Sequence, residues 1–148
     1  MREGEEAGQF GAIDLPALQR IRSLWLDLEP LVQHSEYDDP IAPTSLRIEL
    51  RDGIGPADAA QFEVQWSRLG NYSFHYVDEA NLNWRFDRHP NPHSPVRHFH
   101  APPDATDAEP SYIQVDEVSL VTRAVQKLWR AAYKSDDLNR LNSASNPP

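Results

Sequence analysis

The sequence predicts an α+β domain in which a four-stranded antiparallel meander carries an N-terminal and a C-terminal helix on one face, in the order α-β-β-β-β-α. Apolar residues recur at helical spacing near both ends of the chain, and they alternate with polar residues in between. Short turn sequences separate the alternating stretches. Short turns favour antiparallel neighbours, and two amphipathic helices can bury one face of such a sheet.

The N-terminal helix is expected over residues 15–29. Asp14 can cap its first turn, and Pro16 stands in that turn, where a missing N–H costs nothing. The apolar positions at helical spacing are Leu18, Ile21, Trp25 and Leu28, with Leu24 beside them. Pro30 follows directly and marks the expected end of the helix.

Four strands are expected in the middle of the chain, over residues 45–52, 61–68, 72–78 and 82–87. Each alternates apolar and polar residues, as a half-buried strand does. The apolar sets are Leu46, Ile48 and Leu50; Phe62, Val64 and Trp66; Tyr72, Phe74 and Tyr76; and Leu82, Trp84 and Phe86. The turn sequences D-G-I-G-P, L-G-N and D-E-A-N separate them.

The C-terminal helix is expected where the helical period returns, from Gln114 onward. Its apolar positions are Val118, Val121, Val125, Leu128, Trp129 and Ala132. Asp116 early and Lys134 late would suit the helix dipole. With 148 residues the chain is long enough for one domain, which we expect over residues 14–136, between a disordered N-terminus (1–13) and a disordered tail (137–148).

The composition predicts a soluble, cytoplasmic protein with no membrane partner. There is no cysteine and no apolar run long enough to cross a membrane. The net charge of −9 opposes loose binding to nucleic acid, so any RNA contact has to be local. Only Lys127 and Lys134 are lysine, and this acidic, lysine-poor composition resembles that of proteins from salt-loving archaea.

A histidine-rich segment follows the last predicted strand. Residues 85–100 read R-F-D-R-H-P-N-P-H-S-P-V-R-H-F-H and contain four of the six histidines. The prolines favour a stiff loop. Alternation also places His75 on the same sheet face as Arg85 and Asp87, if the third and fourth predicted strands pair through D-E-A-N. The sequence therefore predicts a polar patch on that face, with the histidine segment at its edge.

Three interpretations of this patch remain open. The first is a metal-free site for phosphodiester cleavage, in which His75, His98 and His100 transfer protons and Arg85 or Arg97 binds phosphate. In the second interpretation, His98 and His100 bind a divalent metal ion, with Asp87 or His93 completing the ligand set. In the third, the histidines only satisfy irregular backbone and have no chemical role.

The motifs of this region resemble the TumE family of toxins from toxin–antitoxin systems. The resemblance rests on S-R-L-G-N-Y-S-F-H-Y-V-D-E-A-N-L-N-W-R-F-D, on the proline–histidine segment ending H-F-H, and on the amphipathic helix that follows, roughly residues 45–133. Where the family pattern has a doubled histidine, this chain reads N-P-H, so no family role carries over to His89 or His93. The matching polar positions are His75, Arg85, Asp87, His98 and His100.

The resemblance implies a growth-inhibiting toxin that a cognate antitoxin neutralises. The family does not define a reaction, but the histidine, arginine and aromatic residues together lead us to expect RNA cleavage through the five matching residues, without a cofactor. Tyr76, Arg97 and His93 are expected as substrate-binding residues on the same grounds, with no family role behind His93. Tyr76 would serve by stacking on a base if it is exposed. Two alternatives are a non-catalytic toxin that acts by protein interaction and a domain that binds a divalent metal through His98 and His100. A homodimer through a sheet edge or the helices is also possible.

Overall fold

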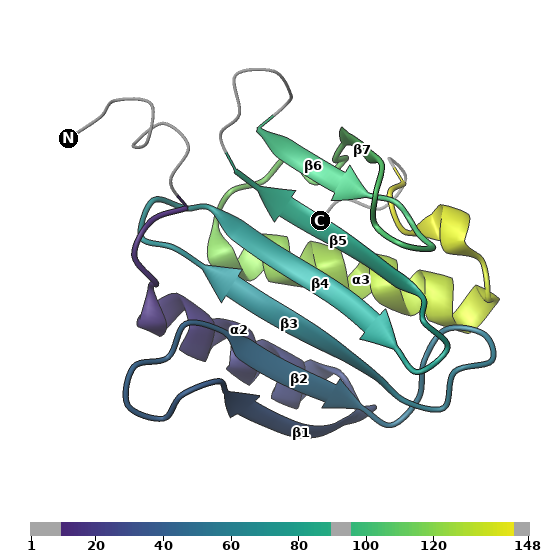
Figure 1. Cartoon of the computed structure of the whole chain (residues 1–148), viewed down its shortest axis with the longest axis horizontal. Helices are drawn as coiled ribbons and strands as arrows, with labels where there is room; N and C mark the ends of the chain where they lie inside the picture. Colours follow the sequence, from purple (N-terminus) through teal and green to yellow (C-terminus); the bar gives the residue numbers. More distant parts are fainter. Residues whose placement is uncertain (1–9, 90–95, 144–148) are drawn as a thin grey trace.

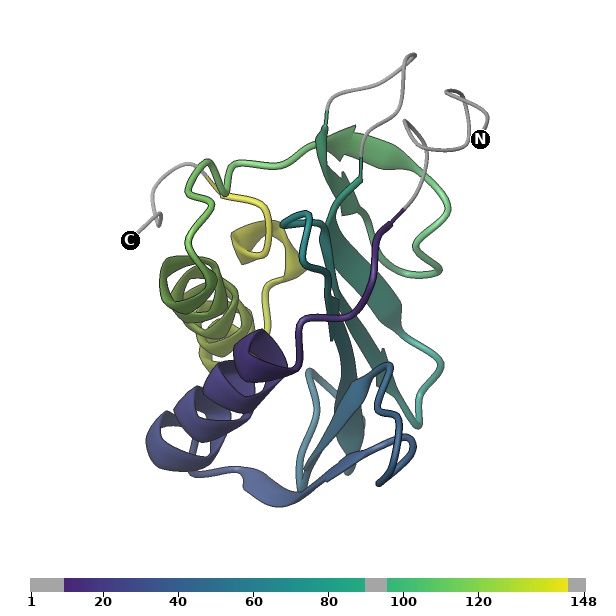
Figure 2. The ribbon, with the colours of Figure 1, turned by 90° about the vertical axis from the view of Figure 1, so that its left-hand side faces the viewer.

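The computed structural model describes residues 10–89 and 96–143, which form a two-layer α+β fold. A seven-stranded antiparallel sheet makes one layer, and its strands follow one another in chain order from β1 to β7. The two helices, α2 and α3, make the other layer and lie against the same face of the sheet (Figures 1 and 2). The predicted α+β class and the two helices on one face are confirmed, while the predicted number of four strands is wrong.

Both helices begin at acidic caps. Helix α2 (Leu15–Leu28) starts after Asp14, whose carboxylate accepts a hydrogen bond from the backbone N–H of Ala17 at 3.1 Å. Helix α3 (Val118–Ser135) starts after Glu117, whose carboxylate accepts from two N–H groups of the first turn. Because Glu117 is the cap, the helix begins four residues later than the apolar pattern from Gln114 suggests.

The strands that alternation predicts correspond to β2 (Leu46–Leu50), β3 (Ala60–Trp66), β4 (Tyr72–Asp78) and β5 (Asn83–Arg88). Three further strands extend this meander: β1 (Val32–Tyr37), β6 (Arg97–His100) and β7 (Ala108–Pro110). The sheet is thus one strand wider on the β2 side and two strands wider on the β5 side than expected.

Each additional strand lacks the clean apolar alternation of a half-buried strand. Strand β1 is an edge strand with a register shift between Val32 and His34, so its sequence V-Q-H-S-E-Y shows no period of two. Strand β6 begins two residues after Pro95, so the prolines leave its ladder intact. Strand β7 ends with Pro110 at the sheet edge, where a missing N–H is tolerated.

The core lies between the sheet and the helices and is rich in aromatic rings. Phe62 is at its centre, with its ring centroid 4.7 Å from that of Trp25 and 5.5 Å from that of Trp84. Tyr76 and Trp84 stack across β4 and β5 at 5.0 Å. Burial of rings this large stabilises the packing of both helices against one face of the sheet, which leaves the opposite face for polar residues.

The described structure extends past both ends of the expected domain. Before residue 14, Ile13 forms a β-bridge with Ser67. After residue 136, a 3₁₀ helix (Leu138–Arg140) leads to Leu141, which is fully buried in the core. Among the described residues, neither helix is long and apolar enough to cross a membrane.

Candidate functional site

The face of the sheet opposite the helices gathers the polar residues of β4, β5 and β6. His75 of β4 is the Cα partner of Arg85 of β5, and Arg85 is the partner of His100 of β6. Two residues further along β5, Asp87 is the partner of His98. Because side chains of paired residues point to the same side, the ladder brings these groups to one surface.

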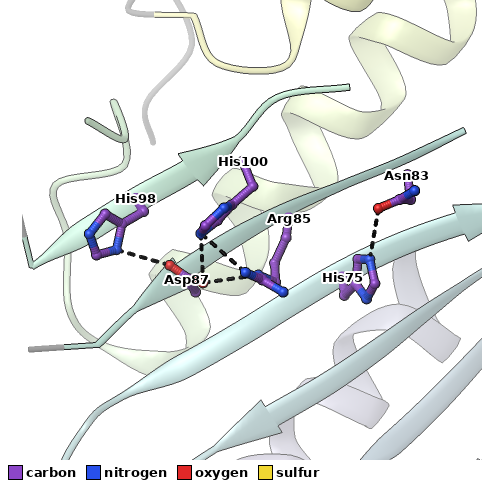
Figure 3. A network of polar contacts seen from close by, with 6 residues as sticks. All are labelled: His75, Asn83, Arg85, Asp87, His98 and His100. Atoms are coloured by element: carbon purple, nitrogen blue, oxygen red, sulfur yellow. Dashed lines mark hydrogen bonds and ion pairs between the residues drawn. The ribbon is translucent and has the colours of Figure 1, made fainter. Parts of the chain in front are cut away.

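Asp87 is the centre of a four-residue polar cluster (Figure 3). Its Oδ1 lies 3.1 Å from Nδ1 of His98, and its Oδ2 lies 3.2 Å from Nε2 of His100. The same Oδ2 accepts a hydrogen bond from Nε of Arg85 at 3.0 Å. The Asp87 side chain is only 14% exposed, so two imidazoles and a guanidinium compensate a carboxylate that is largely removed from water. We call Arg85, Asp87, His98 and His100 the Asp87 cluster.

His98 contacts Asp87 through one ring nitrogen only. An ionised carboxylate is an acceptor, so Nδ1 of His98 carries the proton and donates it to Asp87. No hydrogen bond of Nε2 is recorded within residues 10–89 and 96–143. The carboxylate therefore fixes the ring orientation and leaves Nε2 as the second site of the ring for a proton, on a side chain that is 9% exposed.

His100 lies between a donor and an acceptor. Its Nε2 is 3.2 Å from Nη2 of Arg85, which can only donate, and 3.2 Å from Asp87 Oδ2, which can only accept when ionised. Burial, the strongest effect, lowers the pKa of His100; the Arg85 charge lowers it further, while the Asp87 charge raises it. The neutral ring is thereby favoured at neutral pH.

His75 belongs to a separate pair on the same face. Its Nε2 lies 3.3 Å from Oδ1 of Asn83, and no hydrogen bond links it to the Asp87 cluster in the part of the chain that the structure describes. The Asn83 amide donates from Nδ2 to the Pro103 carbonyl at 3.4 Å, which turns Oδ1 toward His75. Sequence reasoning assigned no role to Asn83, because nothing in the sequence indicates its contact with Pro103.

Two of the predicted substrate-binding residues lie on the helix side of the sheet instead. Tyr76 is fully buried in the core, so the exposure that stacking on a base would require is not met. Arg97 is the partner of Arg88 on that side, and both form ion pairs with Asp116, the residue before the α3 cap. Arg97 therefore joins β6 to the start of α3 and does not point toward the cluster. The third such residue, His93, lies outside the described residues.

Asp87, His98 and His100 also form a possible metal-ligand set. One donor atom from each lies within 4.8 Å of the others. In the described ranges a second set meets the same criterion, made of His34, Glu36 and Glu49 near the β1 edge. That second set is more exposed, with 54% of the His34 side chain accessible to solvent.

Comparison with known proteins gives a single family assignment. A family model described as Toxin TumE matches residues 21–135, which is most of the chain and includes the whole Asp87 cluster. No curated protein and no solved structure shows a significant match.

Proposed function

The chain belongs to the TumE toxin family and is the toxin component of a toxin–antitoxin system, and we propose that it inhibits growth by metal-independent RNA cleavage at the Asp87 cluster. The observation that carries this proposal is the shared carboxylate of Asp87, which orients two imidazoles and one guanidinium toward a common point on the open sheet face. Phosphodiester cleavage needs those groups: a base, an acid and a fixed cation.

The two imidazoles suit the two proton transfers of the reaction. Their ring centroids are 5.9 Å apart, which lets each ring reach a different oxygen of one phosphodiester. His100 is favoured in the neutral form and acts as the base: with Nε2–H donated to Asp87, its Nδ1 lone pair takes the proton of the 2′-OH. His98, which the hydrogen bond from Nδ1 to Asp87 holds in place, acts as the acid through Nε2.

The reaction balances without water or metal. The 2′ oxygen forms a bond to phosphorus as His100 removes its proton, and the bond from phosphorus to the 5′ oxygen breaks. His98 protonates the departing 5′ oxygen. The products are a 2′,3′-cyclic phosphate and a free 5′-OH, and the two histidines exchange protons with solvent before the next cycle.

Arg85 supplies the fixed positive charge. Its Nε donates to Asp87, and its side chain is 33% exposed, so the remaining N–H groups can approach a phosphate oxygen. A guanidinium that is held in place in this way stabilises the charge that builds up on the phosphorane oxygens. Because the protein carries a net charge of −9, this local cation is important for holding RNA at the cluster.

A cognate antitoxin is the protein partner that membership of the family implies. We propose that it neutralises the toxin by covering the polar sheet face, because occluding the Asp87 cluster requires no change of structure. His75, hydrogen-bonded to Asn83 beside the cluster, lies in the area that such a partner would cover.

Expression of the toxin in a bacterial host, with total RNA analysed on a denaturing gel, tests the proposed function. Growth arrest with defined RNA fragments is expected for the wild type and for His34→Ala, which removes an exposed histidine at the far edge of the same face. The double variant His98→Ala/His100→Ala should give neither. Growth arrest with intact RNA would instead identify a non-catalytic toxin that acts by binding, and a fully toxic double variant would exclude the assigned residues.

A further inference from the structure

One donor atom from each of Asp87, His98 and His100 lies within 4.8 Å of the others, and each imidazole nitrogen is near the carboxylate at a distance that a tetrahedral zinc site would need. Zinc bonds to imidazole nitrogen and carboxylate oxygen are about 2.0–2.2 Å long, which places neighbouring donors of a tetrahedron about 3.3–3.5 Å apart. In the cluster, Asp87 Oδ1 lies 3.1 Å from His98 Nδ1, and Asp87 Oδ2 lies 3.2 Å from His100 Nε2. Imidazole and carboxylate together suit Zn²⁺ better than Mg²⁺ or Ca²⁺.

Arg85 contacts two of these donor atoms. Its Nε lies 3.0 Å from Asp87 Oδ2, and its Nη2 lies 3.2 Å from His100 Nε2. Arginine cannot lose its proton in a protein, so it places a permanent positive charge where a dication would have to sit. A metal ion could bind only if this guanidinium moved away, which would also break its bond to Asp87.

We propose that Arg85 and Zn²⁺ compete for the donor set of Asp87, His98 and His100, and that Arg85 is the residue that keeps this centre free of metal. The same competition makes Zn²⁺ an inhibitor of the toxin at high concentration, because the ion would hold both imidazoles and displace the phosphate-binding guanidinium. This inhibition rests on the proposed RNA cleavage, whereas the competition for the donor atoms does not.

The competition predicts that substitutions of Arg85 and of His98 change the affinity for Zn²⁺ in opposite directions. Arg85→Gln removes the charge but keeps a side chain of similar length, so it should increase the affinity for Zn²⁺ at least tenfold. His98→Ala in the Arg85→Gln background removes a ligand and should abolish that gain. A role of Arg85 in stability alone predicts no increase in metal affinity, and a simple metal site predicts tight binding in the wild type.

The second donor set of the chain provides a matched control. Arg47 contacts Glu36 and Glu49, as Arg85 contacts Asp87, but the His34, Glu36 and Arg47 side chains are each more than 40% exposed. Water already solvates these groups, so we expect Arg47→Gln to leave the zinc affinity of the protein unchanged.

Calorimetric titration of the full chain with ZnCl₂ tests the proposal without any RNA. We expect weak binding by the wild type and by Arg47→Gln, and one equivalent bound at least tenfold more tightly by Arg85→Gln. The charge-preserving variant Arg85→Lys keeps a cation at the site and should show a clearly smaller gain in zinc affinity than Arg85→Gln.

Equal zinc affinities for wild type and Arg85→Gln would overturn the proposal, as would a gain that survives removal of His98. If Arg85→Gln fails to show a cooperative thermal transition, Arg85→Ala takes its place: tighter zinc binding than the wild type supports the competition, and an affinity equal to that of the wild type overturns it.

Discussion

Asp87 and His98 face each other across the β5–β6 ladder, and Oδ1 of Asp87 lies 3.1 Å from Nδ1 of His98. The contact joins two residues that are 11 positions apart, on either side of the proline-rich segment. It determines that Nδ1 of His98 carries the proton shared with Asp87, so that Nε2 is the nitrogen available for the proposed proton transfer. The proposed activity therefore depends on a carboxylate whose role is to orient and charge-balance an imidazole.

Asp87→Asn should reduce RNA cleavage at least about 100-fold, because the amide can present its NH₂ group to His98 and thereby favour the wrong tautomer. The cleavage rate of the purified variant on total RNA measures this. Glu63→Gln is the matched control, since Glu63 is an exposed carboxylate on the same face, opposite His75. Equal losses in both variants would show that general surface charge, and not the Asp87 contact, matters.

The pH dependence of cleavage should reflect the environment of His100. Burial lowers the pKa of His100 below its ordinary value of 6.5, and the proposed base is active only when neutral. The acidic limb of the kcat/KM profile should therefore have its midpoint below pH 6.5. A midpoint at or above 6.5 would argue against His100 as the base.

The free energy of unfolding should also depend on pH through His100. The unfolded chain binds a proton at His100 near pH 6.5, whereas the folded chain does so only at lower pH, so the unfolded state holds more protons in between. Stability consequently falls as the pH drops through about 6.5, and this loss is complete below the lowered pKa. Urea unfolding midpoints between pH 5 and 8 should show a shallower acid decline for His100→Gln than for the wild type.

Tyr76→Phe should lower the free energy of unfolding by about 1–3 kcal/mol, because it leaves a buried N–H without its partner. The Tyr76 hydroxyl accepts from the backbone N–H of Ile54 at 3.0 Å and donates to Asp78 at 2.8 Å. Denaturant unfolding measures the loss. RNA binding of the folded variant should match the wild type, and weaker binding at unchanged stability would restore Tyr76 as a substrate-binding residue.

The sequence predicts the central sheet better than its edges. Strands β2 to β5 are half-buried and alternate cleanly, so one face is apolar in each of them. Strand β1 lies at an edge with a register shift, and its pairing with β2 depends on contacts such as Glu36 with Arg47, which no local pattern reveals. Strand β6 has only one core residue, Phe99, between its two histidines.

The candidate site was only partly predicted because two of its residues, His98 and His100, lie on β6, a strand that the sequence did not predict. The H-x-H spacing of His98 and His100 matches the spacing of Arg85 and Asp87, which is the signal that two short strands could pair. Sequence reasoning placed the four residues near one another, but a proline-rich loop gives no register, so it could not identify Asp87 as the shared partner. For the same reason the sheet face of Arg97 could not be predicted, because a residue's face is defined only once the strand is known.

The most direct test of the central claim is the chemistry of the RNA ends made by the purified protein in EDTA. Total RNA is incubated with the wild type or with His98→Ala/His100→Ala, and new 5′-OH ends are labelled with polynucleotide kinase without prior phosphatase treatment. The account predicts labelled fragments and matching 2′,3′-cyclic phosphate ends with the wild type, and neither with the double variant. Intact RNA with the wild type, or fragments bearing 5′-phosphates, would contradict it.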